Sequence, residues 1–311
     1  MTTHKAVLML LLTTFIWGTG FIGVQMALDY GYAPLRILTV RFVMAALVFD
    51  LVCFKKLRAV NKAEVKLGSL LAFFMFGGFF FQTVGQDKST PSVCAFVTSS
   101  YVMMVPFIDW LLLKKKPGPW LMVCSAVTLA GVALISVNGD FSISAGALLT
   151  LASAVFYAFQ VSCTGIFTKT HSPAALTAVM LNVMALAAIA LTVLEYQLDR
   201  FLASGAAARQ LPVFPPQAAA VLAYLALFCT LIAFFAQSIG QKYTTGTQAA
   251  IIFSTESVFG ALLSAIIYKE IFSAKMVLGC VLIFAAIVLS NLNLRRVING
   301  RNLSKKVGQK G

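Results

Sequence analysis

The sequence predicts an all-α integral membrane protein with ten transmembrane helices in two inverted five-helix repeats. Of its 311 residues, 60% are hydrophobic and 11% are charged, and the mean hydropathy is +0.91. Apolar stretches of about twenty residues, enough helix to cross a bilayer core of about 30 Å, fill nearly the whole chain. Polar residues recur at a spacing of 155 positions. Because lipid supplies no hydrogen-bond partners to the backbone, such stretches must be helical.

The predicted spans leave room for no soluble domain. Seven contain no charged residue, and they cover residues 6–28, 67–86, 117–139, 141–168, 172–194, 212–241 and 276–294. Three carry a few charges, and they cover residues 34–54, 91–113 and 243–268. In chain order these segments give ten helices, and the only sizeable loop lies over residues 195–216.

An internal repeat divides the chain into two halves. Residues of the third and fourth spans match residues 155 positions later; the first set is Gln82, Gly85, Gln86, Thr90, Ala95 and Ser99, and the second is Gln237, Gly240, Gln241, Thr245, Ala250 and Ser254. Earlier in each half, Trp17 matches Tyr157 at a spacing of 140. Each half has five spans, and an odd number makes the second half enter the membrane from the opposite side. We expect a first repeat over residues 1–139 and a second over 140–294.

Lysine and arginine are concentrated on one side of this topology. The chain has 24 Lys and Arg against 10 Asp and Glu, a formal net charge of +14. Basic clusters at 55–66, at 114–116 and in the tail 295–311 follow spans that end on the side of the N-terminus. The positive-inside rule therefore predicts that both termini are cytoplasmic. We interpret the basic tail as a topology and lipid-headgroup signal, so that membrane lipid and not nucleic acid is the expected partner.

The residue types needed for catalysis or metal binding are sparse. The only histidines are His4 and His171, and the six cysteines are scattered with no C-x-x-C pair. No Walker A sequence is present. The sequence GTGFIG at 18–23 satisfies a dinucleotide-binding pattern, but it lies inside a predicted span, where small residues serve close helix packing or a bend. We expect no enzymatic activity, no cofactor and no metal.

Two charged residues lie deep within predicted spans. Glu256 is near the middle of the ninth, where an acidic residue costs roughly 2.5–3.5 kcal/mol on insertion scales. It either binds a substrate ammonium or a coupling proton, or serves as a structural partner between helices. Arg41 in the second span either meets a substrate carboxylate, pairs with Glu256, or extends outward to the interface.

Amide and aromatic residues add hydrogen-bonding groups to the spans. Gln82 and Gln86 are four residues apart and share a helix face, and Gln237 and Gln241 repeat this pair. The other candidates are Trp17, Tyr101, Tyr157, Gln160 and Asn182. Each taken alone is as compatible with interhelical hydrogen bonding as with substrate contact. The matched pairs in both halves favour a shared central cavity, so we include all of them as candidate substrate-binding residues.

Several segments resemble the EamA-type drug/metabolite transporter superfamily. Residues 94–135, beginning CAFVTSSYVMMVPF, are similar to the fourth and fifth helices of that family, and 248–290 to its ninth and tenth. The segment FIWGTGFIGVQMAL resembles its first helix. The resemblance implies ten helices around a central cavity, with the fifth and tenth at the periphery. It also implies alternating access and movement of small metabolites, often amino acids, across the bacterial inner membrane.

The ninth helix of this family often carries Glu-Pro, followed by a run that ends in Gly-Glu. Glu256 and Glu270 match the two acids, whereas Ser257 replaces the proline and Lys269 the glycine. A kink caused by proline is therefore not expected at this point.

We expect a secondary transporter, an exporter that moves small amino-acid-like or amphipathic metabolites across the inner membrane. The expected partner is a small-molecule substrate, and Glu256 binds either that substrate or a coupling proton. The sequence does not define the oligomeric state. A phosphate-ester or nucleotide-sugar exchanger is a second hypothesis. Such substrates require several basic residues deep in the spans, and Arg41 is the only basic residue at that depth. A non-transporting membrane scaffold is a third, and it would not require matched polar residues in both halves.

Overall fold

The computed structural model describes residues 2–114, 116–136, 144–202, 215–244, 246–286 and 289, and every regular element within them is helical. The helices of the first half are α1 (Thr3–Asp29), α2 (Pro34–Leu57), α3 (Lys62–Gln86), α4 (Pro91–Ser99), α5 (Tyr101–Leu113) and α6 (Pro119–Ser136). Those of the second half are α7 (Ala145–Phe167), α8 (Pro173–Leu202), α9 (Pro216–Ala226), the π-helix η1 (Leu227–Ile232), α10 (Ala233–Lys242), α11 (Gly246–Phe253), α12 (Thr255–Ile267) and an apolar helix at Ala274–Ala286.

Within the described residues, eight helical segments are long and apolar enough to cross a membrane, so the chain is a multi-pass membrane protein. Three of the eight are composite: α4 with α5, α9 with η1 and α10, and α11 with α12. Two shorter apolar helices, Met122–Leu134 and Ala274–Ala286, lie where the fifth and tenth spans are predicted. The predicted spans 117–139, 141–168, 212–241, 243–268 and 276–294 each extend into positions outside the described residues, and the basic tail 295–311 lies wholly outside them.

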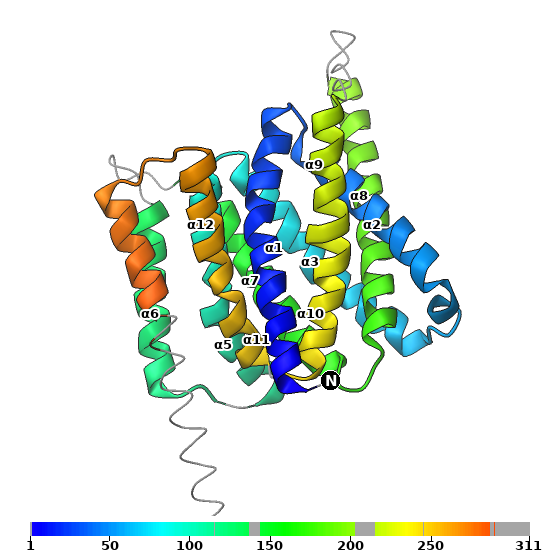
Figure 1. The fold of residues 1–311 in the computed structure, drawn as a ribbon, viewed down its shortest axis with the longest axis horizontal. Helices are drawn as coiled ribbons and strands as arrows, with labels where there is room; N and C mark the ends of the chain where they lie inside the picture. The colour runs from blue at the N-terminus through cyan, green and yellow to red at the C-terminus, as the bar shows by residue number, and fades with distance from the viewer. Residues whose placement is uncertain are drawn as a thin grey trace, which may run out of the picture.

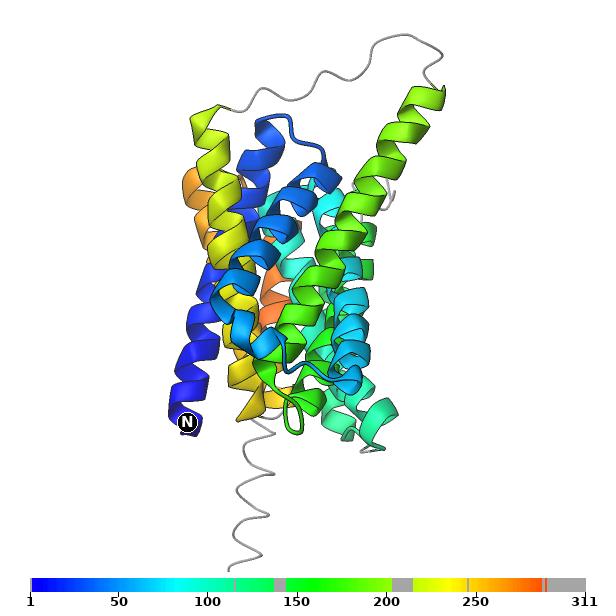
Figure 2. The same cartoon turned by 90° about the vertical axis from the view of Figure 1, so that its right-hand side faces the viewer.

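The helices form a bundle whose segments run alternately up and down from the end that holds the N-terminus (Figures 1 and 2). Helix α7 runs antiparallel to α3. Gly146 at the start of α7 lies against Gly85 near the end of α3, and the backbone N–H of Ser172, beyond α7, donates to the Glu64 carboxylate near the start of α3 (3.2 Å). Helices α3 and α7 therefore cross the bundle in opposite directions.

The helix boundaries follow from local sequence. Proline is the first residue of α2, α4, α6, α8 and α9, a position where its missing N–H costs no intrahelical bond. Helix α3 begins with a capping box, in which the Asn61 side chain accepts from the Glu64 N–H and the Glu64 carboxylate accepts from the Asn61 N–H. Gly31, with φ of +84°, allows the tight turn between α1 and α2.

Two spans are interrupted near their middle, each at a serine. The fourth span breaks at Ser100, whose hydroxyl donates to the carbonyl oxygen of Val97 (2.7 Å). The ninth breaks at Ser254, and the Ser257 hydroxyl donates back to the Ser254 carbonyl oxygen (2.9 Å). The ninth helix is therefore interrupted although it has no proline at that point.

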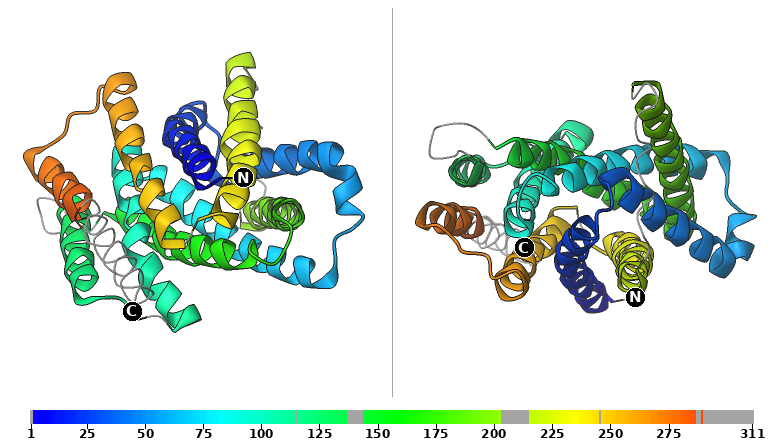
Figure 3. Two further views of the ribbon diagram at one scale, coloured as in Figure 1. Left: turned by 60° about the horizontal axis from the view of Figure 1, so that its bottom comes forward. Right: turned by 90° about the horizontal axis from the view of Figure 1, so that it is seen from above.

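The helices of the two halves interleave around a common centre (Figure 3). Helix α3 packs on α7 and α8, α2 on α8, α1 on α10 and α12, and α4 on α12. Helix α6 and Ala274–Ala286 lie side by side at the edge of the bundle (Figure 1), where Gly131 of α6 is in close contact with Ile283 and Gly279. The central helices are therefore drawn from both halves, and the two short apolar helices are peripheral.

Lys169 joins two helix ends near the N-terminal end of the bundle. Its Nζ donates to the carbonyl oxygens of Gln241 (3.0 Å), Lys242 (2.6 Å) and Thr244 (2.6 Å) at the end of α10. The last carbonyls of a helix lack intrahelical partners and carry partial negative charge, which a lysine ammonium satisfies. This contact ties the end of α7 to the end of α10.

Replacing Lys169 by methionine is expected to lower the free energy of unfolding by about 1–3 kcal/mol, because bonds to a charged donor are lost while the aliphatic chain is kept. Thermal unfolding in detergent measures the change. Lys66→Met is the matched control, because Lys66 is exposed and has no bonded partner among the described residues. Equal melting temperatures for the two variants would contradict a stabilising role for Lys169.

Candidate functional site

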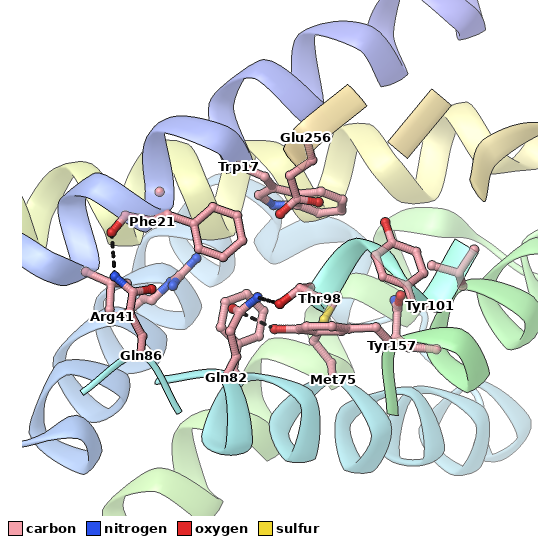
Figure 4. A pocket seen from close by; sticks show the side chains of 15 residues that line it. Trp17, Phe21, Arg41, Met75, Gln82, Gln86, Thr98, Tyr101, Tyr157 and Glu256 are labelled. Carbon is pink, nitrogen blue, oxygen red and sulfur yellow. Dashed lines mark hydrogen bonds between the residues drawn. The ribbon is translucent and has the colours of Figure 1, made fainter. Parts of the chain in front are cut away.

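A cavity lies between helices of both halves, near the interruptions of the fourth and ninth spans (Figure 4). It holds ≈ 530 Å³ of space between protein atoms, including the part open to the outside. The lining residues are Trp17, Gly20, Phe21, Val24, Arg41, Met75, Phe79, Gln82, Gln86, Thr98, Tyr101, Tyr157, Gln160, Val161 and Glu256.

Helical spacing explains why these residues meet. Those from α1 and α3 recur at steps of three or four, so each set lies on one helix face: Trp17, Gly20, Phe21 and Val24 on α1, and Met75, Phe79, Gln82 and Gln86 on α3. Helix α7 adds Tyr157, Gln160 and Val161 with the same logic. The cavity walls are thus three helix faces, closed by α2 and by the interrupted fourth and ninth spans.

A chain of hydrogen bonds, drawn as dashed lines in Figure 4, joins three of the lining residues. The Tyr157 hydroxyl donates to Oε1 of Gln82 (3.0 Å), and Nε2 of Gln82 donates to Oγ1 of Thr98 (3.1 Å). The Tyr157 ring meets those of Tyr101 and Phe79 edge-on, at centroid distances of 6.1 and 5.6 Å. These contacts hold the aromatic and amide groups in fixed positions at the cavity surface.

Two other glutamines make equivalent bonds in the two halves. Nε2 of Gln86 donates to the carbonyl oxygen of Phe21 in α1 (2.7 Å), and Nε2 of Gln241 donates to that of Val161 in α7 (3.0 Å). The donors are 155 residues apart and the acceptors 140, which are the spacings of the sequence repeat. Gln86 lines the cavity, whereas Gln241 is fully buried between α7 and α10.

Arg41 is buried, with 2% of its surface exposed, and reaches the cavity from α2. Its Nε donates to the Thr230 hydroxyl, and its Nη2 donates to the carbonyl oxygen of Cys229 (3.0 Å). The guanidinium carbon lies 4.3 Å from the centre of the Phe79 ring, a cation–π contact. The structure shows no ion pair between Arg41 and Glu256, so of the predicted alternatives the pairing with Glu256 is not observed among the described residues.

Glu256 is 6% exposed and stands in the first turn of α12, immediately after the interruption at Ser254. Its carboxylate has no hydrogen-bond or ion-pair partner in the described part of the chain, and neither oxygen is fully enclosed. Figure 4 places it beside Trp17 and facing the cavity. Tyr101, which follows the interruption at Ser100, occupies the matching position 155 residues earlier and lines the same cavity.

Glu270, the second acid of the ninth-helix pattern, lies away from the cavity. Its Oε1 accepts from the Ser92 hydroxyl at the start of α4, and its Oε2 accepts from the Ser264 hydroxyl of α12 (both 2.5 Å). These bonds join the end of the ninth span to the beginning of the fourth, so Glu270 has a structural role.

Of the eleven residues singled out from the sequence, eight line this cavity: Glu256, Arg41, Trp17, Gln82, Gln86, Tyr101, Tyr157 and Gln160. Three do not. Asn182 of α8 donates from Nδ2 to Oδ1 of Asp50 (2.9 Å). Gln237 and Gln241 lie between α10 and α7, where Gln237 donates to Oε1 of Gln160 (3.0 Å) and Gln241 donates to the carbonyl oxygen of Val161. Their amides connect helices in this conformation.

The lining residues that sequence reasoning missed are small or apolar: Gly20, Phe21, Val24, Met75, Phe79, Thr98 and Val161. In a chain this hydrophobic, composition does not separate cavity walls from lipid-facing surfaces. Helical spacing from the polar candidates was an available signal. Steps of three or four residues back from Gln82 reach Phe79 and Met75, and steps forward from Trp17 reach Gly20, Phe21 and Val24.

Comparison with known proteins identifies the family to which this arrangement belongs. The sequence model of the EamA-like transporter family matches residues 4–137 and 144–292, which together make up most of the chain. The chain belongs to the EamA-like transporter family. Membership of a transporter family implies a non-enzymatic function, in keeping with the lack of a catalytic constellation in the sequence.

One relative is also described as a transporter, and one solved structure shares the fold. A protein of Archaeoglobus fulgidus described as an uncharacterized transporter is 29% identical over 290 residues, which cover 92% of this chain and 85% of that protein. A crystal structure, described only as that of a protein, superposes with a TM-score of 0.65 at 18% identity and covers 94% of this EamA-like chain and 99% of its own. At that identity the structural likeness shows the fold alone.

Proposed function

We propose that this EamA-like protein is a secondary transporter that exports small amino-acid-like or amphipathic metabolites by alternating access. The substrate sits in the central cavity, with its ammonium facing Glu256 and its apolar part against Trp17, Tyr101 and Tyr157. Glu256 takes either the substrate ammonium or a coupling proton. The proposal includes ten spans in two inverted repeats, with the protein in the cell inner membrane and both termini in the cytoplasm.

The observation that carries the proposal is a carboxylate without a protein partner inside an aromatic-walled cavity. An uncompensated acid within a membrane-spanning segment is costly, so it is retained where it faces a ligand, an ion or water. Glu256 meets this description, because it is buried, lines the cavity and has no bonded partner among the described residues. A primary ammonium or a proton is the chemical group that complements it.

Equivalent contacts in both halves support the inverted-repeat part of the proposal. Gly85 packs closely against Thr150 of α7, and Gly240, 155 positions later, packs against Leu10 of α1, which is 140 positions before Thr150. Lys114 and Lys269, also 155 apart, both have positive φ, of 57° and 49°. The family model matches one segment on each side of residue 140. A symmetric pair of halves is the usual basis for opening a central site alternately to the two sides.

A phosphate-ester or nucleotide-sugar exchanger is disfavoured by the charges of the cavity. Arg41 is the only buried basic residue in the part of the chain that the structure describes, and Glu256 would repel a phosphate. A cavity lined by one cation and one acid suits a substrate that carries at most one negative group.

Counterflow in proteoliposomes tests the proposed function. Vesicles containing purified protein are loaded with unlabelled phenylalanine, and uptake of a trace of labelled phenylalanine is followed. A carrier is expected to show transient accumulation of label above its equilibrium level, because internal substrate returns the binding site to the outside. Labelled glucose 6-phosphate in matched vesicles is expected to show none.

Accumulation of the phosphate ester instead of the amino acid would favour the exchanger. If neither compound accumulates, and a wider set of neutral amino acids also fails, the amino-acid proposal is contradicted. Equal uptake with and without internal phenylalanine would contradict alternating access.

A further inference from the structure

The Arg41 guanidinium has N–H donors at the cavity surface that make no hydrogen bond to the described residues. A guanidinium carries five N–H donors, and within the described residues Arg41 uses its Nε and one donor of Nη2. Nη1 makes no hydrogen bond to the described residues. It is not fully enclosed by protein atoms, and Arg41 lines the cavity, so we place Nη1 at the cavity surface. In Figure 4 Arg41 lies toward Gln86 and Phe21, apart from Glu256.

The current partners of Arg41 are neutral, and both belong to η1. The Thr230 hydroxyl accepts from Nε of Arg41 and donates to the carbonyl oxygen of Leu225, five residues back (2.8 Å). The Cys229 carbonyl oxygen accepts from Nη2 of Arg41 and also from Nε1 of Trp17 (3.2 Å). The π-helical segment η1 therefore holds the Arg41 guanidinium of α2 and the Trp17 ring of α1 at one carbonyl oxygen, that of Cys229.

The matching part of the first half has no such turn. Residues 72–77 stand 155 positions before Leu227–Ile232 and lie within the continuous α-helix α3. The π-helical segment is thus a departure from the repeat, and it coincides with the one buried cation of the described residues. π-Helices are rare, appear mostly as single turns within α-helices, and are frequently found at functional sites.

We propose that Arg41 is a carboxylate subsite of the cavity and that η1 is the partner that holds its guanidinium while the subsite is empty. This inference rests on the proposed function and adds to it the second end of the substrate. A carboxylate binds a guanidinium more strongly than a neutral carbonyl or hydroxyl does. An arriving carboxylate therefore competes with Cys229 and Thr230 for Arg41, and the substrate class narrows to zwitterions with the carboxylate at Arg41 and the ammonium at Glu256.

This competition predicts that substitutions at Arg41 and at Thr230 change the affinity for carboxylate compounds in opposite directions. Removing the guanidinium weakens the binding of compounds that carry a carboxylate. Removing the Thr230 hydroxyl raises the free energy of the empty subsite, so that the same compounds bind more tightly, because a ligand no longer displaces that partner. A structural Arg41 that only braces α2 against η1 would instead make both substitutions harmful.

Trp17 fluorescence in detergent reports binding without requiring transport. Trp110 and Trp120 are the other tryptophans, and both are partly exposed and outside the cavity, so a Trp110→Phe, Trp120→Phe background leaves Trp17 as the reporter. The probes are phenylalanine and phenylalaninamide, which share the ammonium and the ring and differ in the carboxylate. Dissociation constants are measured in this background and with Arg41→Gln, Arg41→Lys or Thr230→Val.

We expect Arg41→Gln to weaken phenylalanine binding about tenfold or more and to leave phenylalaninamide within about twofold, with Arg41→Lys between these values. Thr230→Val is expected to tighten phenylalanine about three- to tenfold with no change for the amide. If Arg41→Gln does not fold, the sign of the Thr230→Val effect decides alone.

Equal losses for both probes in Arg41→Gln, or weaker phenylalanine binding in Thr230→Val, would overturn the carboxylate subsite while leaving the proposed function in place. Phenylalanine binding that is unaffected by all three substitutions would do the same. If neither probe binds the unsubstituted cavity, both the subsite and the proposed function are contradicted.

Discussion

Replacing Glu256 by glutamine is expected to abolish counterflow, with a loss of about a hundredfold or more, because the substrate ammonium loses the charge that holds it. The protein should remain folded. The carboxylate has no bonded partner among the described residues, so the substitution breaks no contact and removes the cost of a buried charge. An unchanged or higher melting temperature is therefore expected together with lost transport. Counterflow and thermal unfolding of the same preparation measure the two effects.

Glu64→Gln is the matched control, because Glu64 is as buried as Glu256, at 6% exposed, but lies outside the cavity. Its two oxygens accept from the backbone N–H groups of Asn61 (3.1 Å) and Ser172 (3.2 Å). An amide replaces one acceptor by a donor, so we expect this variant to lose about 1 kcal/mol of stability and to keep its transport. Normal transport by Glu256→Gln across the pH range would show that Glu256 has no role in the cycle.

Replacing Gly146 by alanine is expected to be among the most destabilising single changes in the bundle. A Cβ at this position would lie 2.6 Å from the carbonyl oxygen of Lys88 and 2.8 Å from that of Gly85. Both are backbone atoms, at and just after the end of α3, and they cannot move aside as a side-chain tip would. Helices α3 and α7 must separate, which we expect to cost about 3 kcal/mol or more. Because they carry Gln82, Gln86 and Tyr157, their separation also disrupts the cavity.

Thermal unfolding with a thiol-reactive dye measures this effect, since Cys94, Cys124, Cys163 and Cys229 are buried in the folded protein. Gly118→Ala is the control, because a Cβ there meets no atom within 4 Å. Gly146→Ala should melt well below the unsubstituted protein, and Gly118→Ala should melt with it. Coincident melting of both variants would contradict the close packing of α3 on α7.

The helical membrane class and the family could be predicted from the sequence, because apolar length and the order of diffuse motifs survive without coordinates. The cavity was predictable where polarity marks it. Glu256, Gln82 and Tyr157 stand out against apolar neighbours, and the structure brings them to one cavity. Phe21, Met75 and Phe79 carry no such contrast, and only the register of their helices assigns them to the cavity rather than to lipid.

Other features depend on tertiary contacts that composition does not encode. The partner of Arg41 could not be foreseen, because Cys229 and Thr230 become acceptors only where the backbone forms the π-helical η1. The interruption of the ninth span at Ser254 was also not predicted, because no proline stands at that point in the sequence. Asn182 was indistinguishable from a cavity residue until its bond to Asp50 was seen.

The central claim is that Glu256 faces a wet cavity in the middle of the membrane, and cysteine labelling tests it most directly. Glu256→Cys and Val258→Cys are compared in a background without native cysteines, using a charged, membrane-impermeant methanethiosulfonate reagent. Val258 is on the same helix, is 38% exposed and does not line the cavity. We expect rapid labelling at position 256 and slow labelling at 258. Faster labelling at 258, or none at 256 from either side of the membrane, would contradict the claim.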